Sequence, residues 1–219
     1  PTALTDEGGF SNVLALTPAG DAVDHCTSAT GTTLPMLDQR GYTRDASADA
    51  GAFELGGTLP APDNDLCDGA IALECGTTVN GDTTNATNTD APLETCGTTL
   101  TSGPGVWYTL TFPAGNDYNV SVDTFESGFD TKLGVFSGAC DALVCVGGND
   151  DTGGVQSQVE FVALAGETYS VYVTGFGSNT GLYNLTTTCE EILGLDNNTI
   201  EGWLLIIIAG IIIIRIKKK

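Results

Sequence analysis

Short stretches in which apolar and polar residues alternate, or in which apolar residues run together, recur along the second half of the chain. They cover residues 106–112, 118–125, 131–136, 158–164, 168–176 and 181–188, with turn-forming residues between them. In the fifth stretch, Tyr169, Val171 and Val173 fall on one side of an extended strand, and the residues between them fall on the other. Short strands at regular spacing with glycine-rich turns are typical of an antiparallel β-sandwich, so the pattern predicts an all-β fold.

The chain before these strands lacks a periodic apolar pattern. Residues 14–54 fit no amphipathic helix, and residues 55–65 contain two prolines and two adjacent glycines. This composition predicts an irregular N-terminal segment, a linker over residues 56–62 and a sandwich domain that begins near Asp63. Within that domain we expect Trp107 to be a core anchor rather than a platform for a ligand.

Five charged residues of the N-terminal segment have the signs needed for a small ion-pair network. They are Asp38, Arg40, Arg44, Asp49 and Glu54.

The charge balance excludes one class of partner. The chain has 28 acidic and 7 basic residues, a formal net charge of -21, and four of the bases lie at the extreme C-terminus. Everything before them holds only Arg40, Arg44 and Lys132 against all the acids. Because nucleic-acid binding needs clustered Lys and Arg, we expect no nucleic-acid partner.

Seven cysteines indicate a disulfide framework in an oxidising compartment, outside the inner membrane. Six of them lie in the expected sandwich: Cys67, Cys75, Cys96, Cys140, Cys145 and Cys189. A zinc site is a poor alternative, because the sequence has no CxxC pair and His25 is its only histidine.

The spacing of the sandwich cysteines suggests how they pair. Cys140 and Cys145 flank four residues, a separation that suits the closure of a hairpin or loop. The other four cysteines allow three pairings. The pairs that we favour are Cys140–Cys145, Cys75–Cys96 and Cys67–Cys189.

Oxygen-bearing side chains gather in three stretches that we expect to be loops. Ca²⁺ takes six to eight oxygens from carboxylates, amides and backbone carbonyls, which makes these stretches a candidate calcium site. The candidates are Asp63, Asn64, Asp65 and Asp68 in PDNDLCD, Asp130 in FDTKL, and Asn149, Asp150 and Asp151 in GGNDDTGG. The competing interpretation is that these residues form Asx turns at strand ends.

No catalytic constellation is visible in the sequence. Ser–His–Asp and Cys–His arrangements need a histidine, and His25 lies outside the sandwich. No Walker loop, dinucleotide fingerprint or HExxH motif occurs, and pairs of carboxylates are uninformative among 28 acids. We therefore expect a protein that is not an enzyme within these residues, with any catalytic site lying upstream.

The N-terminal segment also carries a resemblance. TPAGDAVD at residues 17–24, DQRGYTR at 38–44 and DAGAFE at 49–54 are similar, in order and spacing, to the end of bacterial surface proteins built as right-handed parallel β-helices. The resemblance implies that residues 1–55 are the last coils and cap of such a solenoid. That family commonly has a cysteine where this chain has Ala48, which implies that Cys26 has lost its partner.

A second resemblance covers residues 63–189. DNDLCDGAIAL, GDTTNAT, GVWYTLTF, FDTKLGVFSGAC, GNDDTGG and GETYSVYVTGFGSNTGLYNLTTT occur in order. Together they resemble the pre-peptidase C-terminal family of jelly-roll-like β-sandwiches, which are appended to secreted bacterial proteases and other surface proteins. The resemblance implies an accessory module that in some members binds calcium or attaches to a polymer, and it does not imply catalysis.

After a linker over residues 190–199, the chain ends in an apolar stretch and a basic cluster. Twelve uncharged residues, 203–214, form about 18 Å of helix, and the seventeen residues 200–216 reach the lower limit for a membrane span. We expect a hydrophobic helix over residues 200–219 that is anchored by Trp203, Arg215, Lys217, Lys218 and Lys219. Its basic end is expected to stay cytoplasmic and the acidic part outside.

The order of short motif, apolar stretch and terminal basic cluster resembles bacterial C-terminal sorting signals. Such signals are read by rhombosortases or exosortases, although TIEGW is only loosely like their short motif. The resemblance implies a sorting protease as a partner and transient anchoring in the inner membrane.

These features predict the C-terminal part of an exported bacterial protein at the cell surface or outside the cell. The leading hypothesis is a non-catalytic role in display, adhesion, or binding of a surface polysaccharide or other polymer. The alternatives are an accessory part of a β-helix enzyme that degrades polysaccharides, and a structural subunit that self-associates. The chain starts at Pro1 without a signal-peptide pattern, so we expect either a removed signal or a longer chain.

Overall fold

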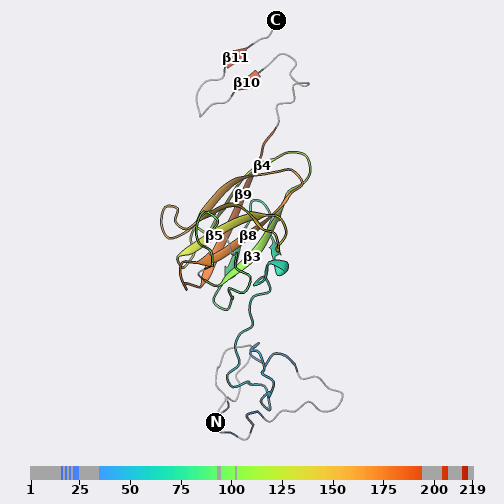
Figure 1. Ribbon diagram of the computed structural model, residues 1–219, viewed down its shortest axis with the longest axis vertical. Coiled ribbons are helices and arrows are strands. Elements are labelled where there is room, and N and C mark those ends of the chain that lie inside the picture. The colour runs from blue at the N-terminus through green and yellow to red at the C-terminus, as the bar shows by residue number, and fades with distance from the viewer. Residues whose placement is uncertain are drawn as a thin grey trace.

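The structure is a computed structural model, and its strands form an all-β sandwich (Figure 1). It describes residues 35–92, 95–101 and 103–193, together with residues 16, 18, 20 and 22–24 and the backbone of 204–206 and 214–216. Cys26 and His25 lie outside these residues. The strands of the two packed sheets run from Ile71 to Glu191.

One layer is a five-stranded sheet with the order β1-β3-β8-β5-β6. Its strands are β1 (Ile71–Ala72), β3 (Gly105–Thr111), β8 (Thr168–Gly175), β5 (Thr131–Ser137) and β6 (Val144–Asn149). The β1–β3 pair is parallel, and the other pairs are antiparallel.

The other layer is a four-stranded antiparallel sheet with the order β2-β9-β4-β7. Its strands are β2 (Thr78–Asp82), β9 (Leu182–Glu191), β4 (Tyr118–Asp123) and β7 (Gln158–Ala163). The six strands expected from the sequence are all present, whereas β1, β2 and β6 were not expected. These three are edge strands, and their short or glycine-containing sequences give a weak strand signal.

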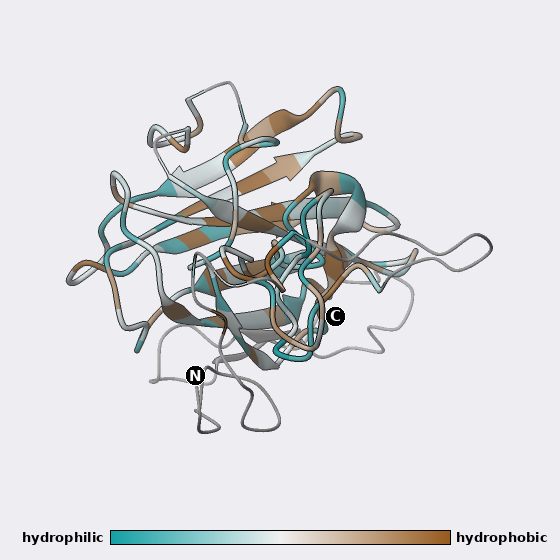
Figure 2. Ribbon diagram, turned by 90° about the horizontal axis from the view of Figure 1, so that it is seen from below, coloured by the Kyte–Doolittle hydropathy of each residue, from teal (hydrophilic) through white to brown (hydrophobic). Residues whose placement is uncertain are grey.

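The main core lies between the two sheets. The side of β8 that carries Tyr169, Val171 and Val173 faces this core, as the alternation predicts. Inward-facing residues of the other sheet, including Val122 and Leu185, pack in the same cluster. Figure 2 shows the corresponding mixture of hydrophobic and hydrophilic segments along the strands.

A second apolar cluster covers the outer side of the five-stranded sheet. Trp107 is completely buried there and packs against Tyr172 and Phe136, with ring centroids 4.6 and 6.0 Å away. The expectation of a core anchor is confirmed, but the anchor belongs to this outer cluster. As a result β8 is buried on both sides, and seven of its eight residues are buried.

Polypeptide from outside the sheet closes the outer cluster. The short 3₁₀ turn η1 (Cys67–Gly69) brings in Cys67, and the segment before β3 brings in Cys96 and Leu100. Gly134 permits this cover, because a Cβ there would collide with Leu100. A Cβ at Gly148 would collide with the backbone carbonyl of Cys96.

All six sandwich cysteines form disulfides, but every pairing that we favoured from spacing is wrong. The bonds are Cys67–Cys140, Cys75–Cys189 and Cys96–Cys145. Cys140 and Cys145 do not close their own loop, because each binds a segment that crosses the outer cluster. The physical reason is that η1 and the segment before β3 cover the five-stranded sheet and bring distant cysteines to it. The spacing of cysteines in the sequence does not reveal this arrangement.

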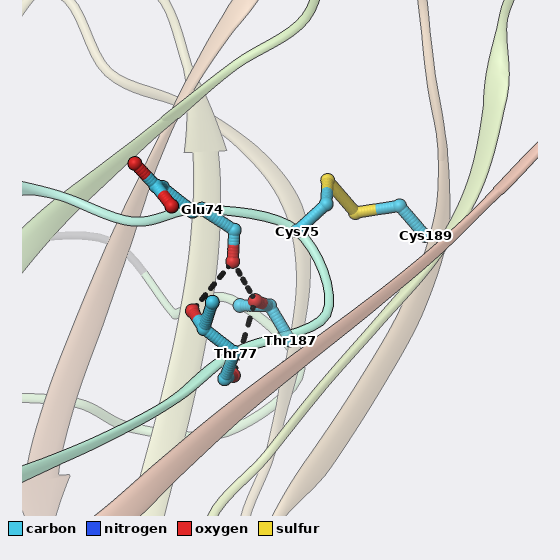
Figure 3. The surroundings of a disulfide bond; sticks show 5 residues. All are labelled: Glu74, Cys75, Thr77, Thr187 and Cys189. Carbon is cyan, nitrogen blue, oxygen red and sulfur yellow. Dashed lines mark hydrogen bonds between the residues drawn. A yellow bond between two sulfur atoms is a disulfide. The ribbon is translucent and has the colours of Figure 1, made fainter.

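The Cys75–Cys189 disulfide ties the start of the domain to its last strand. Cys75 precedes β2 and binds Cys189 of β9, across a sequence separation of 114 residues (Figure 3). Beside it, the carbonyl oxygen of Glu74 accepts hydrogen bonds from the hydroxyls of Thr77 and Thr187, both at 2.7 Å. The disulfide and these hydrogen bonds fix the same corner of the four-stranded sheet.

Four of the five residues expected to form a charge network in the N-terminal segment form two ion pairs. Arg40 binds the Asp38 carboxylate at 2.7 Å, and Arg44 binds the Glu54 carboxylate at 3.1 Å. Burial opposes ionisation of Asp38, but hydrogen bonds from Arg40 and from backbone N–H groups outweigh it and hold the pKa of Asp38 below its ordinary value. The Asp49 carboxylate accepts the N–H groups of Asp24 and Leu55 instead of joining an ion pair.

The expected coils of a β-helix are not shown. Among residues 35–58, the described backbone forms turns and one isolated antiparallel bridge between Leu37 and Thr43. Much of residues 1–34 lies outside the described part of the chain.

The expected C-terminal helix is not shown either. The described parts of the tail are β10 (Leu204–Ile206) and β11 (Ile214–Ile216), which pair antiparallel. Trp203, Lys217, Lys218 and Lys219 lie outside the described residues, and of Arg215 only the backbone is described. Among the described residues, no helix has the length and apolar character to cross a membrane.

Removing the Cys67–Cys140 disulfide is expected to loosen the outer cluster around Trp107. A Cys67→Ala/Cys140→Ala variant should lose about 2–5 kcal/mol of unfolding free energy, as is typical for a native disulfide in a small secreted domain. Urea unfolding in a Trp203→Phe background measures the loss of stability. The emission maximum of Trp107, the remaining tryptophan, should shift to longer wavelength in the folded state.

The matched control is Cys75→Ala/Cys189→Ala in the same background. It should lose a comparable free energy while the native-state emission of Trp107 stays unchanged, since this disulfide lies at the other sheet. Equal red shifts in both variants would contradict the assignment of Cys67–Cys140 to the outer cluster.

Candidate functional site

Three carboxylates meet at one end of the five-stranded sheet. Asp130 directly precedes β5, and Asp150 and Asp151 directly follow β6. Because β5 and β6 are antiparallel neighbours, the start of one lies beside the end of the other. One carboxylate oxygen from each residue lies within 4.8 Å of the others, and we name these three residues the acidic cluster.

The loop that carries the acidic cluster is held by its own hydrogen bonds. The Asn149 side-chain oxygen accepts bonds from the Thr152 hydroxyl at 2.8 Å and from the Gln158 N–H at 3.1 Å. The Ser157 hydroxyl lies 2.6 Å from the Asp150 carbonyl oxygen and 2.7 Å from that of Thr131. Asn149 therefore shapes the loop, and its side-chain oxygen is already engaged.

Lys132 partly neutralises the acidic cluster. Its ammonium lies 3.2 Å from the Asp150 carboxylate, donates to the Thr99 carbonyl oxygen at 3.2 Å and lies 4.7 Å from the centroid of the Phe176 ring. One ammonium beside three carboxylates leaves an excess of negative charge, to which a divalent cation is suited.

Two carboxylate oxygens of the acidic cluster have no hydrogen-bond partner in the described part of the chain. Asp130 Oδ1 and Asp150 Oδ1 are buried and accept no hydrogen bond from the described residues. Burial raises the pKa of Asp130, and the neighbouring Asp150 and Asp151 carboxylates raise it further against the opposing effect of Lys132. The pKa shift and the unpaired oxygens both indicate incompletely compensated charge.

The other expected calcium ligands do not join this group. The Asn64 amide donates to the Trp107 carbonyl oxygen at 2.9 Å, and the Asp65 carboxylate binds the N–H and hydroxyl of Thr87. Asp63 and Asp68 are exposed at the start of the domain and are not part of the cluster. PDNDL thus covers the sheet beside Trp107, and Asn64 and Asp65 hold this cover in place through bonds to residues distant in sequence, instead of binding the acidic cluster or forming Asx turns.

The outward side of the four-stranded sheet forms a second candidate site, which the sequence reasoning missed. The strand register places a set of polar side chains together on it, and we name this surface the polar face. Its residues are Thr78, Asn80, Asn119, Ser121, Asp123, Gln158, Glu160, Asn184, Thr186, Thr188 and Glu190. The alternation in YNVSVD and LYNLTTTCEE is a signal that could have identified it.

Two hollows lie on the polar face. The first has a volume of about 580 Å³ and is lined by residues of β4, β7 and β9, among them Asn119, Glu160 and Glu190. The second has a volume of about 490 Å³ and is lined by Thr78, Asn80, Asp123, Phe125, Glu126, Asn184 and Thr186.

Phe125 gives the second hollow an aromatic wall. It lies in the turn after β4, two residues beyond Asp123, and lines the same hollow as Asp123. Its side chain remains 38% exposed. The next residue, Glu126, has a φ of 64°, and its carbonyl oxygen accepts a hydrogen bond from the Asn184 amide at 3.0 Å.

An Asp130→Asn variant is expected to be more stable than the parent chain at neutral pH in the presence of a chelator. The raised pKa means that the folded state disfavours the ionised carboxylate. Stability should therefore fall as pH rises from the ordinary value of 3.8 through the higher folded-state pKa, and Asn should remove that fall.

Thermal melting of both proteins between pH 3 and pH 7 measures this difference. Asp63→Asn is the control, because it removes an exposed carboxylate outside the acidic cluster. If the Asp130 variant were less stable at neutral pH under chelation, the cluster would not carry uncompensated charge.

Comparisons with known proteins concern the fold. No protein-family model and no curated protein matches the sequence. Among solved structures, the chain is similar to the pre-peptidase C-terminal domain of a collagenase from Bacillus anthracis, with 17% identity and a TM-score of 0.36 over 54% of this chain and 94% of that one. It is also similar to PliG from Aeromonas hydrophila, a periplasmic inhibitor of g-type lysozyme, with 16% identity and a TM-score of 0.33 over 55% of this chain and 96% of that one. Both likenesses cover about half of the chain and carry no argument about its activity.

Proposed function

We propose that residues 63–191 form a non-catalytic binding module of an exported bacterial protein, which attaches that protein to a surface polymer or glycan. The observation that carries the proposal is the polar face, an exposed sheet surface with two hollows. Ligand sites are concave and present a few well-placed polar groups. The polar face has both properties.

Several side chains of the polar face do not serve the fold. Asn80, Asn119, Glu160, Thr188 and Glu190 are exposed, and their side chains make no hydrogen bond with other described residues. Other members of the face, such as Thr78 with Thr186, bind each other. The unpaired amides, hydroxyl and carboxylates are available to a ligand.

The disulfides indicate an extracellular or envelope location. Three disulfides within one sandwich are typical of secreted and envelope proteins and rare in reducing compartments.

The proposal also assigns roles to the segments on either side of the sandwich. The apolar tail over residues 200–219 is a transient inner-membrane anchor that a sorting protease reads. Residues 1–55 end an upstream β-helix, and residues 63–189 belong with the pre-peptidase C-terminal modules.

Two alternative functions make different predictions. An accessory role in a polysaccharide-degrading enzyme predicts that the longer protein shortens the bound polymer. A structural subunit predicts self-association with no polymer bound.

Calcium is part of the proposal as a structural cofactor of the acidic cluster. The residues fit the ion, since Asp130, Asp150 and Asp151 offer oxygen ligands and two of these residues have a buried oxygen without a hydrogen bond. A bound Ca²⁺ supplies the positive charge that Lys132 provides only in part. Its effect on the chain is to fix the end of the β5–β6 hairpin.

Calcium is expected to raise the melting temperature of the 219-residue chain. An ion that binds the folded state alone stabilises it in proportion to the logarithm of its concentration above the Kd. Melting curves in millimolar calcium and in chelator should differ for the parent chain and for the Asp63→Asn control. They should coincide for Asp150→Asn/Asp151→Asn, and a shift retained by that variant would refute the site.

Attachment is tested by passing the 219-residue chain over a panel of immobilised neutral, cationic and anionic polysaccharides. We expect retention on at least one polymer, no shortening of that polymer, and reduced retention for Asn119→Ala/Thr188→Ala. The control is Ser178→Ala/Asn179→Ala, which changes exposed loop residues outside the polar face. Failure of the chain to bind any polymer would contradict the proposal.

A further inference from the structure

We propose that the polar face binds an extended polysaccharide whose sugar units carry free amino groups, with Phe125 as the stacking residue. The inference rests on the proposed binding function and adds the chemical class of the ligand and the place where it binds. Three features of the face carry it: an aromatic wall, a surface charge of one sign, and a length greater than that of one sugar ring.

The second hollow combines the groups that a sugar ring requires. The exposed Phe125 ring offers an apolar surface for the C–H side of a sugar, and the amide of Asn80 lines the same hollow. Thr186 and Asp123 also line it. The Thr186 hydroxyl bonds that of Thr78, and Asp123 Oδ1 accepts the N–H of Phe125, so the second carboxylate oxygen of Asp123 is the group able to bond a sugar hydroxyl or amine. A single ring among polar groups suits an amphipathic sugar better than an apolar peptide anchor.

The negative charge of the sandwich surface indicates which class of polysaccharide it binds. Lys132 is the only basic residue between residues 63 and 191, and it is 5% exposed and paired with Asp150. The hollows meanwhile are lined by the carboxylates of Asp123, Glu126, Glu160 and Glu190. This surface repels uronic acids and sulfated polymers, whereas it attracts ammonium groups.

The two hollows lie along the same strands. Asn119 lines the first hollow and Asp123 lines the second, four residues further along β4. At about 3.3 Å per residue in a strand, that separation is about 13 Å, which exceeds one sugar ring. An oligomer that follows β4 and β9 contacts both hollows.

The test is titration calorimetry of the 219-residue chain with a β-1,4-linked glucosamine hexamer. We expect saturable binding that weakens with salt, because exposed charges are screened. The N-acetylglucosamine hexamer of the same linkage, which is neutral, should bind about tenfold more weakly, equivalent to the loss of one favourable charge contact. A galacturonate hexamer should not bind.

Variants test the place of binding. Phe125→Ala should weaken binding of the glucosamine hexamer about tenfold through loss of the stacking surface. Glu160→Gln and Glu126→Gln should weaken it and reduce its salt dependence. The controls are Phe176→Ala, an exposed ring that lines neither hollow, and Glu167→Gln, an exposed carboxylate outside the face.

Several outcomes would overturn the inference. Equal affinity for the neutral hexamer would remove the role of charge, and unchanged affinity in Phe125→Ala would remove the stacking site. Hexalysine that bound as tightly, with the same loss in Phe125→Ala, would show that a basic peptide is the ligand. If the glucosamine hexamer did not bind but another polymer was retained, this inference would fail while the proposed binding function stood.

Discussion

Burial of β8 on both of its sides is the constraint on which the rest of the structure depends. One side, with Val171 and Val173, packs between the two sheets, and the other carries Tyr172 against Trp107. A sandwich of two sheets alone covers only the first side. The chain therefore needs a third layer, formed by η1 and the segment before β3, and two of the three disulfides connect that layer to the loop after β5 and to β6. The glycines at 134 and 148 allow the layer to approach the sheet closely.

The third layer leaves the two sides of the molecule with different roles. The outer side of the five-stranded sheet is closed by apolar residues and disulfides, so its central strands are unavailable to a ligand. The outward side of the four-stranded sheet has no such cover among the described residues and keeps polar side chains in register. The rigid sheet lowers the ordering cost of binding, because its backbone is already fixed, and its side chains without protein partners are free to bond a ligand. The proposed binding role follows from this asymmetry.

Charge separates two kinds of acidic residue in the sandwich. The cluster of Asp130, Asp150 and Asp151 concentrates negative charge at a strand end, where Lys132 compensates it in part. The carboxylates of the polar face are spread over the sheet without a basic neighbour between residues 63 and 191 other than the paired Lys132. Concentrated carboxylates suit a small divalent ion, whereas spaced carboxylates suit a ligand with repeated positive charges. The same acidic composition therefore supports two different proposals at two places.

The sequence by itself determined the strands with a strong period-two or apolar signal, the all-β class, the cysteines that are oxidised and the ion pairs of the N-terminal segment. These depend on local pattern and on composition, which a linear sequence carries in full. Tertiary structure alone decided that Trp107 lies outside the main core and that Cys140 binds Cys67 instead of Cys145. It also decided that Asn64 binds Trp107, and that Asp65 binds Thr87, instead of joining the acidic cluster. It also decided which polar residues share one face, because that depends on the register between strands that are distant in sequence. Contacts of this kind come from the order of strands in the sheets and from the path of the covering layer, and neither is set by the spacing of residues along the chain.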